Sequence, residues 1–254
     1  SEHGSGIALR EKERGIWKAT TWAQYTEEVL ACAAGLDGLG LKPGDAVLIL
    51  GDNRVRLYCG MLALATLGVY AMPAYPGTTL EELQHFAEEA NVVAALAEDQ
   101  EQVDKILELR DAGAAQLKYI VYDDGRGLGF YEVPGLMSWE HLVEIGSHRL
   151  NGEPGLRENL LGRAKPDDPA VFLHSSGTTG KPKGAELTHS NILLNCAVVS
   201  PRLVPLPLGK ANYLATLPLF HSFGQVVVQN ASIATGGCFS LLPRFNPAEA
   251  LEII

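Results

Sequence analysis

The sequence is poor in the features that mark several classes of protein. It contains four cysteines in 254 residues, namely Cys32, Cys59, Cys196 and Cys238. They lie far apart and form no CxxC pair, so neither a zinc site nor a disulfide framework is indicated. Their apolar neighbours favour four small core residues instead. The apolar runs fall short of the roughly 20 residues that cross a bilayer. We therefore expect a cytoplasmic protein, with peripheral membrane association as an open alternative.

Positive charge is also scarce, since 20 lysines and arginines face 30 aspartates and glutamates, for a formal net charge of −10. This balance excludes binding to nucleic acid through a broad basic surface. It does not exclude phosphate ligands, because an acidic protein can hold a phosphate in a local basic loop. With 46% hydrophobic residues, the chain can bury a sizeable core.

Four common site motifs are absent. A Walker A loop fails because Pro182 stands five residues after Gly177, where glycine is required. A dinucleotide-binding GxGxxG fails at Phe130. A GxSxG nucleophile elbow fails because Leu173 stands two residues before Ser175. The sequence also lacks HExxH, and we expect no metal ligands within this chain.

What is present is an alternation of helices with short apolar strands. Thr21-Trp-Ala-Gln24 predicts a capped helix start, and Thr78 and Thr79, each followed three residues later by Glu, predict another. We predict strands at 46–50, 69–72, 91–96, 118–122, 170–174, 213–216 and 238–242, with helices between most of them. This alternation predicts a layered α/β fold with parallel strands and helices on both faces of the sheet.

Residues 123–168 differ in composition from the rest. They are rich in Gly, Asp, Pro and Arg, and we expect an irregular connection with one short helix near 138–146. It would join two halves, 1–122 and 169–254, of one large domain. The sequence ends at Leu251-Glu-Ile-Ile254, inside a helix predicted to begin after Asn246-Pro247, so we expect a truncated chain.

One loop has a composition suited to chemistry. Ser175-Ser-Gly-Thr-Thr-Gly-Lys-Pro-Lys-Gly184 directly follows an apolar strand. Its glycines permit positive φ and close approach of the backbone to a ligand, and its hydroxyls, lysines and successive amides can hold an anion. The two lysines and the stiffening proline favour a polyphosphate-binding loop over a flexible linker. The candidate phosphate-binding residues are Ser175, Ser176, Gly177, Thr178, Thr179, Gly180, Lys181, Lys183 and Gly184.

This loop resembles the signature loop of the adenylate-forming superfamily, which comprises acyl-CoA synthetases, firefly luciferases and nonribosomal peptide adenylation domains. Four further segments are similar: Thr21-Trp-Ala-Gln-Tyr25, Leu41-Lys-Pro-Gly-Asp45, Leu187-Thr-His-Ser-Asn191 and Leu217-Pro-Leu-Phe-His-Ser-Phe-Gly224. Within the superfamily, Arg10–Trp17 and Ile120–Asp124 look most like bacterial long-chain fatty acyl-CoA synthetases. The resemblance implies an incomplete large N-terminal domain of layered αβα sheets, without the small C-terminal domain.

The resemblance also implies a reaction and its co-substrates. A carboxylate attacks the α-phosphorus of Mg-ATP to give acyl-AMP and pyrophosphate, and the thiol of coenzyme A then displaces AMP. The loop, with Lys183 and Lys181, would hold the β- and γ-phosphates, while Mg²⁺ would supply further positive charge. His221 would be the catalytic residue, at the junction of carboxylate and α-phosphate. His174 and His189 are interpreted as structural residues, at a strand end and a helix start.

An acyl pocket is the least specific part of the resemblance. Its candidates are Phe220, Phe223, Gly224 and Val227, which follow or flank His221. An apolar helical stripe is more often plain core, so both interpretations stay open here.

Several groups that the family places further along are missing from this sequence. These are the adenine-binding stretch, the Tyr-Gly-x-Thr-Glu segment, the ribose-binding Asp, the hinge and the Lys of the small domain. We therefore expect the chain alone to be inactive. A fatty acyl-AMP or aryl-acid ligase of the same superfamily, or a non-catalytic nucleotide- or acyl-binding module, are the alternatives. Only small-molecule partners are expected, and self-association through a truncated surface is left open.

Overall fold

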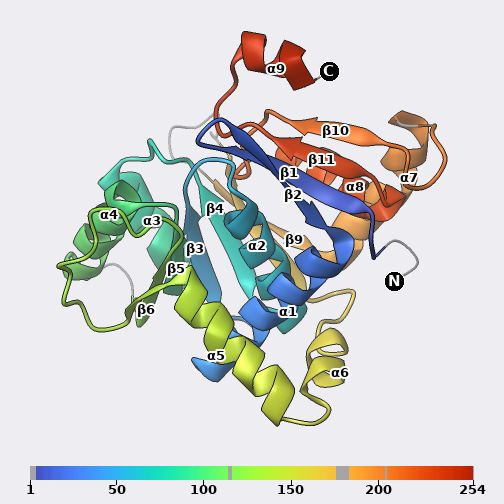
Figure 1. The fold of residues 1–254 in the computed structure, drawn as a ribbon. Coiled ribbons are helices and arrows are strands. Elements are labelled where there is room, and N and C mark those ends of the chain that lie inside the picture. Colours follow the sequence, from blue (N-terminus) through green and yellow to red (C-terminus); the bar gives the residue numbers. More distant parts are fainter. Residues whose placement is uncertain (1–3, 114–115, 176–182, 204, 254) are drawn as a thin grey trace.

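The computed structural model describes residues 4–113, 116–175, 183–203 and 205–253. Two sheets organise the chain (Figure 1). The larger has the order β7 (Leu136–Ser138), β6 (Tyr119–Tyr122), β5 (Val92–Ala97), β3 (Ala46–Leu50), β4 (Tyr70–Ala74), β8 (Pro169–Ser175) and β9 (Lys183–Thr188). The smaller has the order β10 (Asn212–Ala215), β11 (Cys238–Leu241), β1 (Ile7–Glu13) and β2 (Ile16–Thr21).

The predicted parallel arrangement holds for most strands. Neighbouring strands from β7 to β8 pair in parallel, as do β10, β11 and β1. The unpredicted strand β9 pairs antiparallel with β8, and β2 pairs antiparallel with β1. The hairpin of β1 and β2 was also not predicted, because its residues carry many charges and lack an apolar run.

The helices alternate with the strands along the chain. They are α1 (Trp22–Gly38), α2 (Val55–Leu67), α3 (Leu80–Ala90), α4 (Gln100–Asp111), α5 (Trp139–Gly152), α6 (Leu156–Leu161), α7 (His189–Leu203), the π-helix η1 (Phe223–Asn230), α8 (Ala231–Thr235) and α9 (Pro247–Ile253). Both predicted capping boxes form: the backbone N–H of Gln24 donates to Thr21, and that of Glu82 donates to Thr79. No helix in the described part of the chain is long and apolar enough to cross a membrane.

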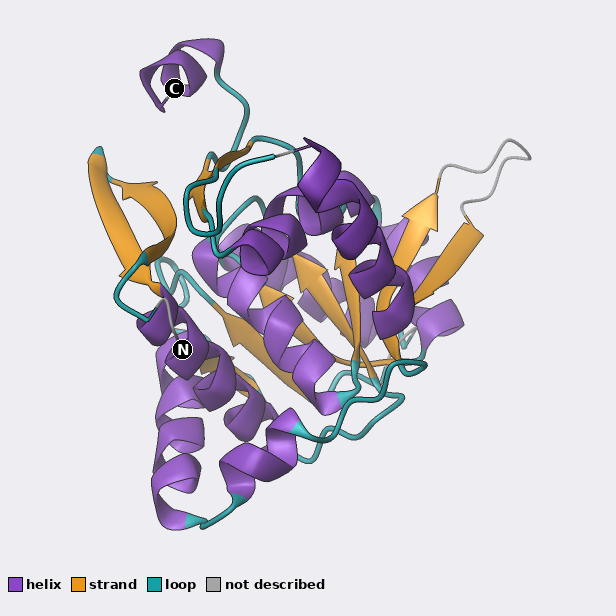
Figure 2. Cartoon of the chain, turned by 90° about the vertical axis from the view of Figure 1, so that its right-hand side faces the viewer, coloured by secondary structure: helices purple, strands orange, loops and turns teal. Residues whose placement is uncertain are grey.

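Strand β3 shows why the large sheet is covered on both faces. All five of its residues are buried, and they alternate between two cores. Val47 and Ile49 pack in the core that includes α1, α2 and α5, whereas Ala46, Leu48 and Leu50 pack in the core that includes α3 and α4. Figure 2 shows helices in front of and behind the sheet. The four cysteines are buried and form no disulfide, as predicted.

The prediction of an irregular segment over 123–168 with one short helix is wrong. The segment contains β7, the 14-residue helix α5 and the short helix α6. Ser138 caps α5 by accepting a hydrogen bond from the backbone of His141, and Trp139 and Leu142 are buried. At Gly146 the helix α5 lies directly against α1, and glycine makes this contact without any apolar signal in the sequence.

The two predicted halves share both sheets. Leu9 in β1 lies beside Phe239 in β11, so the N-terminal hairpin completes the small sheet. Ala71 in β4 lies beside Val171 in β8, so the second half extends the large sheet. Residues 1–122 and 169–254 therefore each contribute strands to both sheets, and neither half forms a layer of its own.

Candidate functional site

The carboxyl ends of strands from both sheets meet at one place. Asn53 lies three residues after the end of β3, and its side-chain Nδ2 donates to the carbonyls of Leu217 at 3.1 Å and Leu242 at 3.2 Å. Those residues follow β10 and β11 respectively. In open α/β sheets, ligands bind at the carboxyl ends of parallel strands. The sequence analysis did not single out Asn53, whose only signal is an amide placed shortly after a buried strand.

The predicted phosphate-binding loop begins at this same edge. Strand β8 runs parallel to β4 and ends at Ser175, which pairs in register with Lys183 at the start of β9. Lys183 is exposed. The predicted residues Ser176, Gly177, Thr178, Thr179, Gly180 and Lys181 lie outside the described residues. Their role therefore stays a prediction, with the two ends of the loop placed by β8 and β9.

Gly184 is required for packing and not for a special backbone angle. Its φ is not positive. A Cβ at this position would lie 2.2 Å from Cζ of Phe172 on the neighbouring strand β8. The ring of Phe172 therefore lies against this glycine, and the predicted close approach of Gly184 to a ligand stays a prediction.

His174 is a packing residue at the end of β8. Its side chain is 7% exposed and stacks on Phe86, with ring centroids 3.5 Å apart. Burial lowers the pKa of His174 to about 4, against the opposing effect of Glu89, whose carboxylate lies 3.6 Å from Nε2. Nearby His85 lowers the pKa of His174 further. The ring is therefore neutral at pH 7, and neither ring nitrogen has a hydrogen-bond partner.

This buried histidine predicts a loss of stability in acid. In the unfolded chain His174 takes up a proton near its ordinary pKa of 6.5, whereas in the folded protein it does so only near pH 4. The free energy of unfolding therefore falls as the pH drops from 6.5 towards 4. At about pH 5 we expect a loss of about 2 kcal/mol from this group. His174→Phe keeps the aromatic stack and should remove that part of the loss. Urea unfolding of both proteins at pH 7 and 5 measures it; equal pH dependence would contradict the assignment.

His221 lies at the apex of a turn after β10. Its backbone N–H donates to the carbonyl of Pro218 at 3.0 Å, and its Nδ1 accepts a hydrogen bond from the backbone N–H of Phe223 at 3.1 Å. Because Nδ1 is the acceptor, the proton of the neutral ring resides on Nε2. The side chain is exposed, so Nε2–H can donate to an anionic oxygen of a ligand.

The predicted acyl-pocket residues differ in their surroundings. Phe220 packs against Tyr75 with the rings tilted and their centroids 5.1 Å apart, and Phe223 is 45% exposed. Gly224 is buried, and a Cβ there would lie 2.5 Å from the carbonyl oxygen of Pro218. Val227 is half-buried. They lie on or next to η1, and π-helical turns are frequent at functional sites. Their acyl-binding role stays a prediction.

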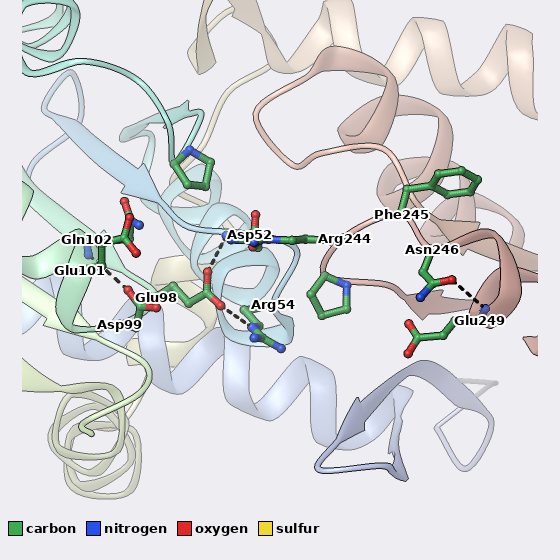
Figure 3. A pocket seen from close by; sticks show the side chains of 12 residues that line it. Asp52, Arg54, Glu98, Asp99, Glu101, Gln102, Arg244, Phe245, Asn246 and Glu249 are labelled. Carbon is green, nitrogen blue, oxygen red and sulfur yellow. Dashed lines mark hydrogen bonds and ion pairs between the residues drawn. The ribbon is translucent and has the colours of Figure 1, made fainter. Parts of the chain in front are cut away.

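A cavity of about 500 Å³ opens beside Asp52 and Arg54 (Figure 3). Its charged lining residues are Asp52, Glu98, Asp99, Glu101, Glu249, Arg54 and Arg244. Both arginines are already paired: Nε of Arg54 lies 2.6 Å from Glu98, and Nε of Arg244 lies 2.7 Å from Asp52. The carboxylates outnumber the arginines, so this cavity does not suit a phosphate.

A second cavity of about 290 Å³ is apolar and lies elsewhere. It is lined by residues of α1, α2 and α8, among them Trp22, Leu62 and Ile233. Two of its other lining residues, Thr66 and Gly236, shortly precede β4 and β11. The cavity therefore lies at the amino ends of these strands, away from His221.

Metal binding finds no support in the described ranges. Among residues 4–113, 116–175, 183–203 and 205–253, no group of three or more His, Cys, Asp or Glu side chains is arranged to hold a metal ion. We therefore assign none of these described residues to Mg²⁺.

The comparison with protein families identifies the class. The AMP-binding enzyme family matches residues 2–254, so this chain belongs to that family. The predicted membership of the adenylate-forming superfamily is thereby confirmed.

Individual relatives agree with this assignment. Long-chain-fatty-acid–CoA ligase ACSBG2 of Mus musculus is 30% identical over 86% of this chain and 32% of its own length. 4-Coumarate–CoA ligase 4 of Arabidopsis thaliana is 28% identical over 92% of this chain and 40% of its own length. The anthranilate CoA ligase AuaEII, solved with anthranoyl-AMP, has the same fold, with a TM-score of 0.81 at 20% identity over 98% of this chain and 44% of that chain. This chain thus spans 32% of the length of ACSBG2 and 40% of the length of 4-coumarate–CoA ligase 4.

Proposed function

We propose that the protein containing this chain activates a long-chain fatty acid with ATP and transfers the acyl group to coenzyme A. Membership of the AMP-binding family and the similarity to long-chain-fatty-acid–CoA ligases support this proposal. The observation that carries it is the meeting of the strand ends at Asn53, which brings the start of the loop and the His221 turn to one edge.

The chemistry needs alignment of two anions more than a nucleophilic side chain. In the first step a carboxylate oxygen attacks the α-phosphorus of ATP, and the bond to the β-phosphate breaks to release pyrophosphate. In the second step the thiol of coenzyme A attacks the acyl carbon, and AMP leaves. Neutralising and positioning charge therefore supply most of the catalysis.

Two groups of this chain would act in the first step. Lys183, with the loop that precedes it, would bind the β- and γ-phosphates. Nε2–H of His221 would donate to an oxygen of the carboxylate or of the α-phosphate, and so lower the repulsion between them. Phe220, Phe223, Gly224 and Val227 would border the acyl chain. Mg²⁺ bound to ATP would add positive charge, without a ligand assigned here.

Removal of the Lys183 charge should weaken ATP binding. For Lys183→Ala we expect the Kd for ATP to rise about tenfold, because a charge-assisted hydrogen bond to phosphate is lost. Isothermal titration with ATP measures the change. Lys42→Ala is the matched control, because Lys42 lies in the turn before β3, at the opposite end of that strand. Equal affinities in wild type and Lys183→Ala would contradict the assignment.

An aryl acid is the second candidate substrate, favoured by the similarity to 4-coumarate–CoA ligase 4. Pyrophosphate release with a panel of fatty and aryl acids, measured on the full-length protein, separates the two. We expect the fastest release with long-chain fatty acids and no appreciable release from residues 1–254 alone. ATP binding without release by the full-length protein would support a binding module instead.

A further inference from the structure

We infer that Asn53 and Gln225 are positioning residues for His221, an inference that rests on the proposed function. Both side chains hold the peptide groups of Leu219, two residues before His221. The backbone N–H of Leu219 donates to Oδ1 of Asn53 at 2.9 Å, and its carbonyl accepts from Nε2 of Gln225 at 2.7 Å. The strand end that leads to His221 is therefore held from both sides.

Asn53 uses both ends of its amide in a dry setting. The residue is 2% exposed. Its Nδ2 binds the carbonyls of Leu217 and Leu242, while its Oδ1 accepts from Leu219 and from the hydroxyl of Tyr58 at 3.4 Å. A buried polar network of this kind specifies one backbone arrangement, because each lost partner leaves an unpaired group. An aspartate could not replace it, since a carboxylate oxygen would face carbonyl oxygens.

Gln225 closes the turn from its other side. It is 1% exposed and lies in the first turn of η1. Besides its side-chain bond to Leu219, its backbone N–H donates to the carbonyl of His221 at 3.3 Å. His221 itself is tied to Pro218 and Phe223. The imidazole is thus oriented by the backbone N–H of Phe223, and the backbone that leads to His221 is held at Leu219 by Asn53 and Gln225.

The effect of these two residues on catalysis would depend on the distance between Nε2 of His221 and a ligand oxygen. The Nε2–H donor of His221 has to meet an oxygen whose position is set by ATP bound at the other side of the site. A shift of about 1 Å in a positioning contact can cost about 100-fold in rate. We therefore assign Asn53 and Gln225 an effect on turnover through His221, without contact to the reacting atoms.

Gln229 provides a matched control in the same helix. It is also a glutamine, is also 1% exposed, and also makes two buried hydrogen bonds, to the hydroxyl of Tyr25 at 3.2 Å and the carbonyl of Tyr58 at 3.0 Å. Neither of these side-chain hydrogen bonds reaches residues 217–221, whereas that of Gln225 does. A purely structural role predicts equal effects for the two glutamines, whereas a positioning role separates them.

The test uses the full-length protein that contains this chain. We compare Gln225→Met, Gln229→Met and Asn53→Ala, each alone and combined with His221→Ala, by ATP–pyrophosphate exchange. For Gln225→Met and Asn53→Ala we expect kcat to fall about 10- to 100-fold with KM for ATP changed less than about threefold. Gln229→Met should keep kcat within about twofold while lowering the urea midpoint as much as Gln225→Met. In the His221→Ala background, Gln225→Met should have no further effect on kcat.

A measurement independent of activity accompanies the kinetics. In protein labelled with ¹³C-histidine, the imidazole signal of His221, assigned by its loss in His221→Ala, should shift or broaden in Gln225→Met and stay unchanged in Gln229→Met.

An unchanged signal in Gln225→Met overturns the inference, and so does a kcat effect of Gln225→Met that persists without His221. If His221→Ala leaves exchange unchanged, the catalytic role of His221 and this inference both fail, while adenylation stands. If wild type shows no exchange with any acid, the proposed function fails, and the histidine signal still decides the positioning.

Discussion

Gly146→Ala is expected to lower the free energy of unfolding by about 3 kcal/mol or more, the range of severe overpacking. At this residue the backbone of α5 lies directly on the backbone of α1. A Cβ on Gly146 would lie 1.7 Å from the carbonyl oxygen of Ala31 and 2.7 Å from the backbone nitrogen of Gly35. Neither atom is the end of a flexible side chain, so the two helices themselves must separate. Urea unfolding monitored by circular dichroism measures the loss.

The same helix supplies the control for this prediction. A Cβ on Gly152, at the end of α5, would meet nothing within 4 Å. Gly152→Ala should therefore leave the free energy of unfolding unchanged or raise it by up to about 1 kcal/mol, since alanine favours helix. A loss under about 1 kcal/mol for Gly146→Ala would show that α5 can move away from α1 at little cost.

His221→Ala is expected to lower kcat for acyl-adenylate formation about 100- to 1000-fold, the effect of losing a hydrogen-bond donor at developing charge. The KM for ATP should change little, because the β- and γ-phosphates are assigned to the loop. The physical reason is the fixed tautomer: with Nδ1 bound to the backbone of Phe223, Nε2 presents the proton. ATP–pyrophosphate exchange in the full-length protein measures both parameters.

The control for His221 is a histidine at a distance from the site. His141 lies on the exposed side of α5, with its side chain 58% exposed, and His141→Ala should leave kcat unchanged. A fall in kcat below about tenfold for His221→Ala would show that the exposed imidazole contributes only local packing.

Local signals in the sequence predicted local structure well. The helix starts at Thr21 and Thr79 depend on a side chain and a backbone amide three residues apart, so the residues that cause them are adjacent in the chain. The apolar strands β3 and β5 were predictable because strands buried on both faces need apolar residues throughout. The apolar strand β8, after which the phosphate-binding loop is predicted, followed from the same kind of pattern.

Contacts between distant segments could not be predicted. Gly146 is an ordinary small residue in the sequence, and its importance arises only when α5 lies against α1. Asn53 and Leu219 are 166 residues apart, and no local pattern marks them as partners. The charged strand β1 became part of the small sheet because it pairs with β11, and β2 joins the sheet through β1.

The sequence by itself determined the family, the alternation of helices and strands, and the glycine- and lysine-containing loop. Each of these depends on residues close together in the chain, where composition and spacing express the physical requirement directly. Only the tertiary structure decided which strands share a sheet, that Gly184 is small because Phe172 covers it, and that Asn53 and Gln225 hold the turn of His221. Those features depend on geometry between segments brought together by burial of the apolar faces of both sheets.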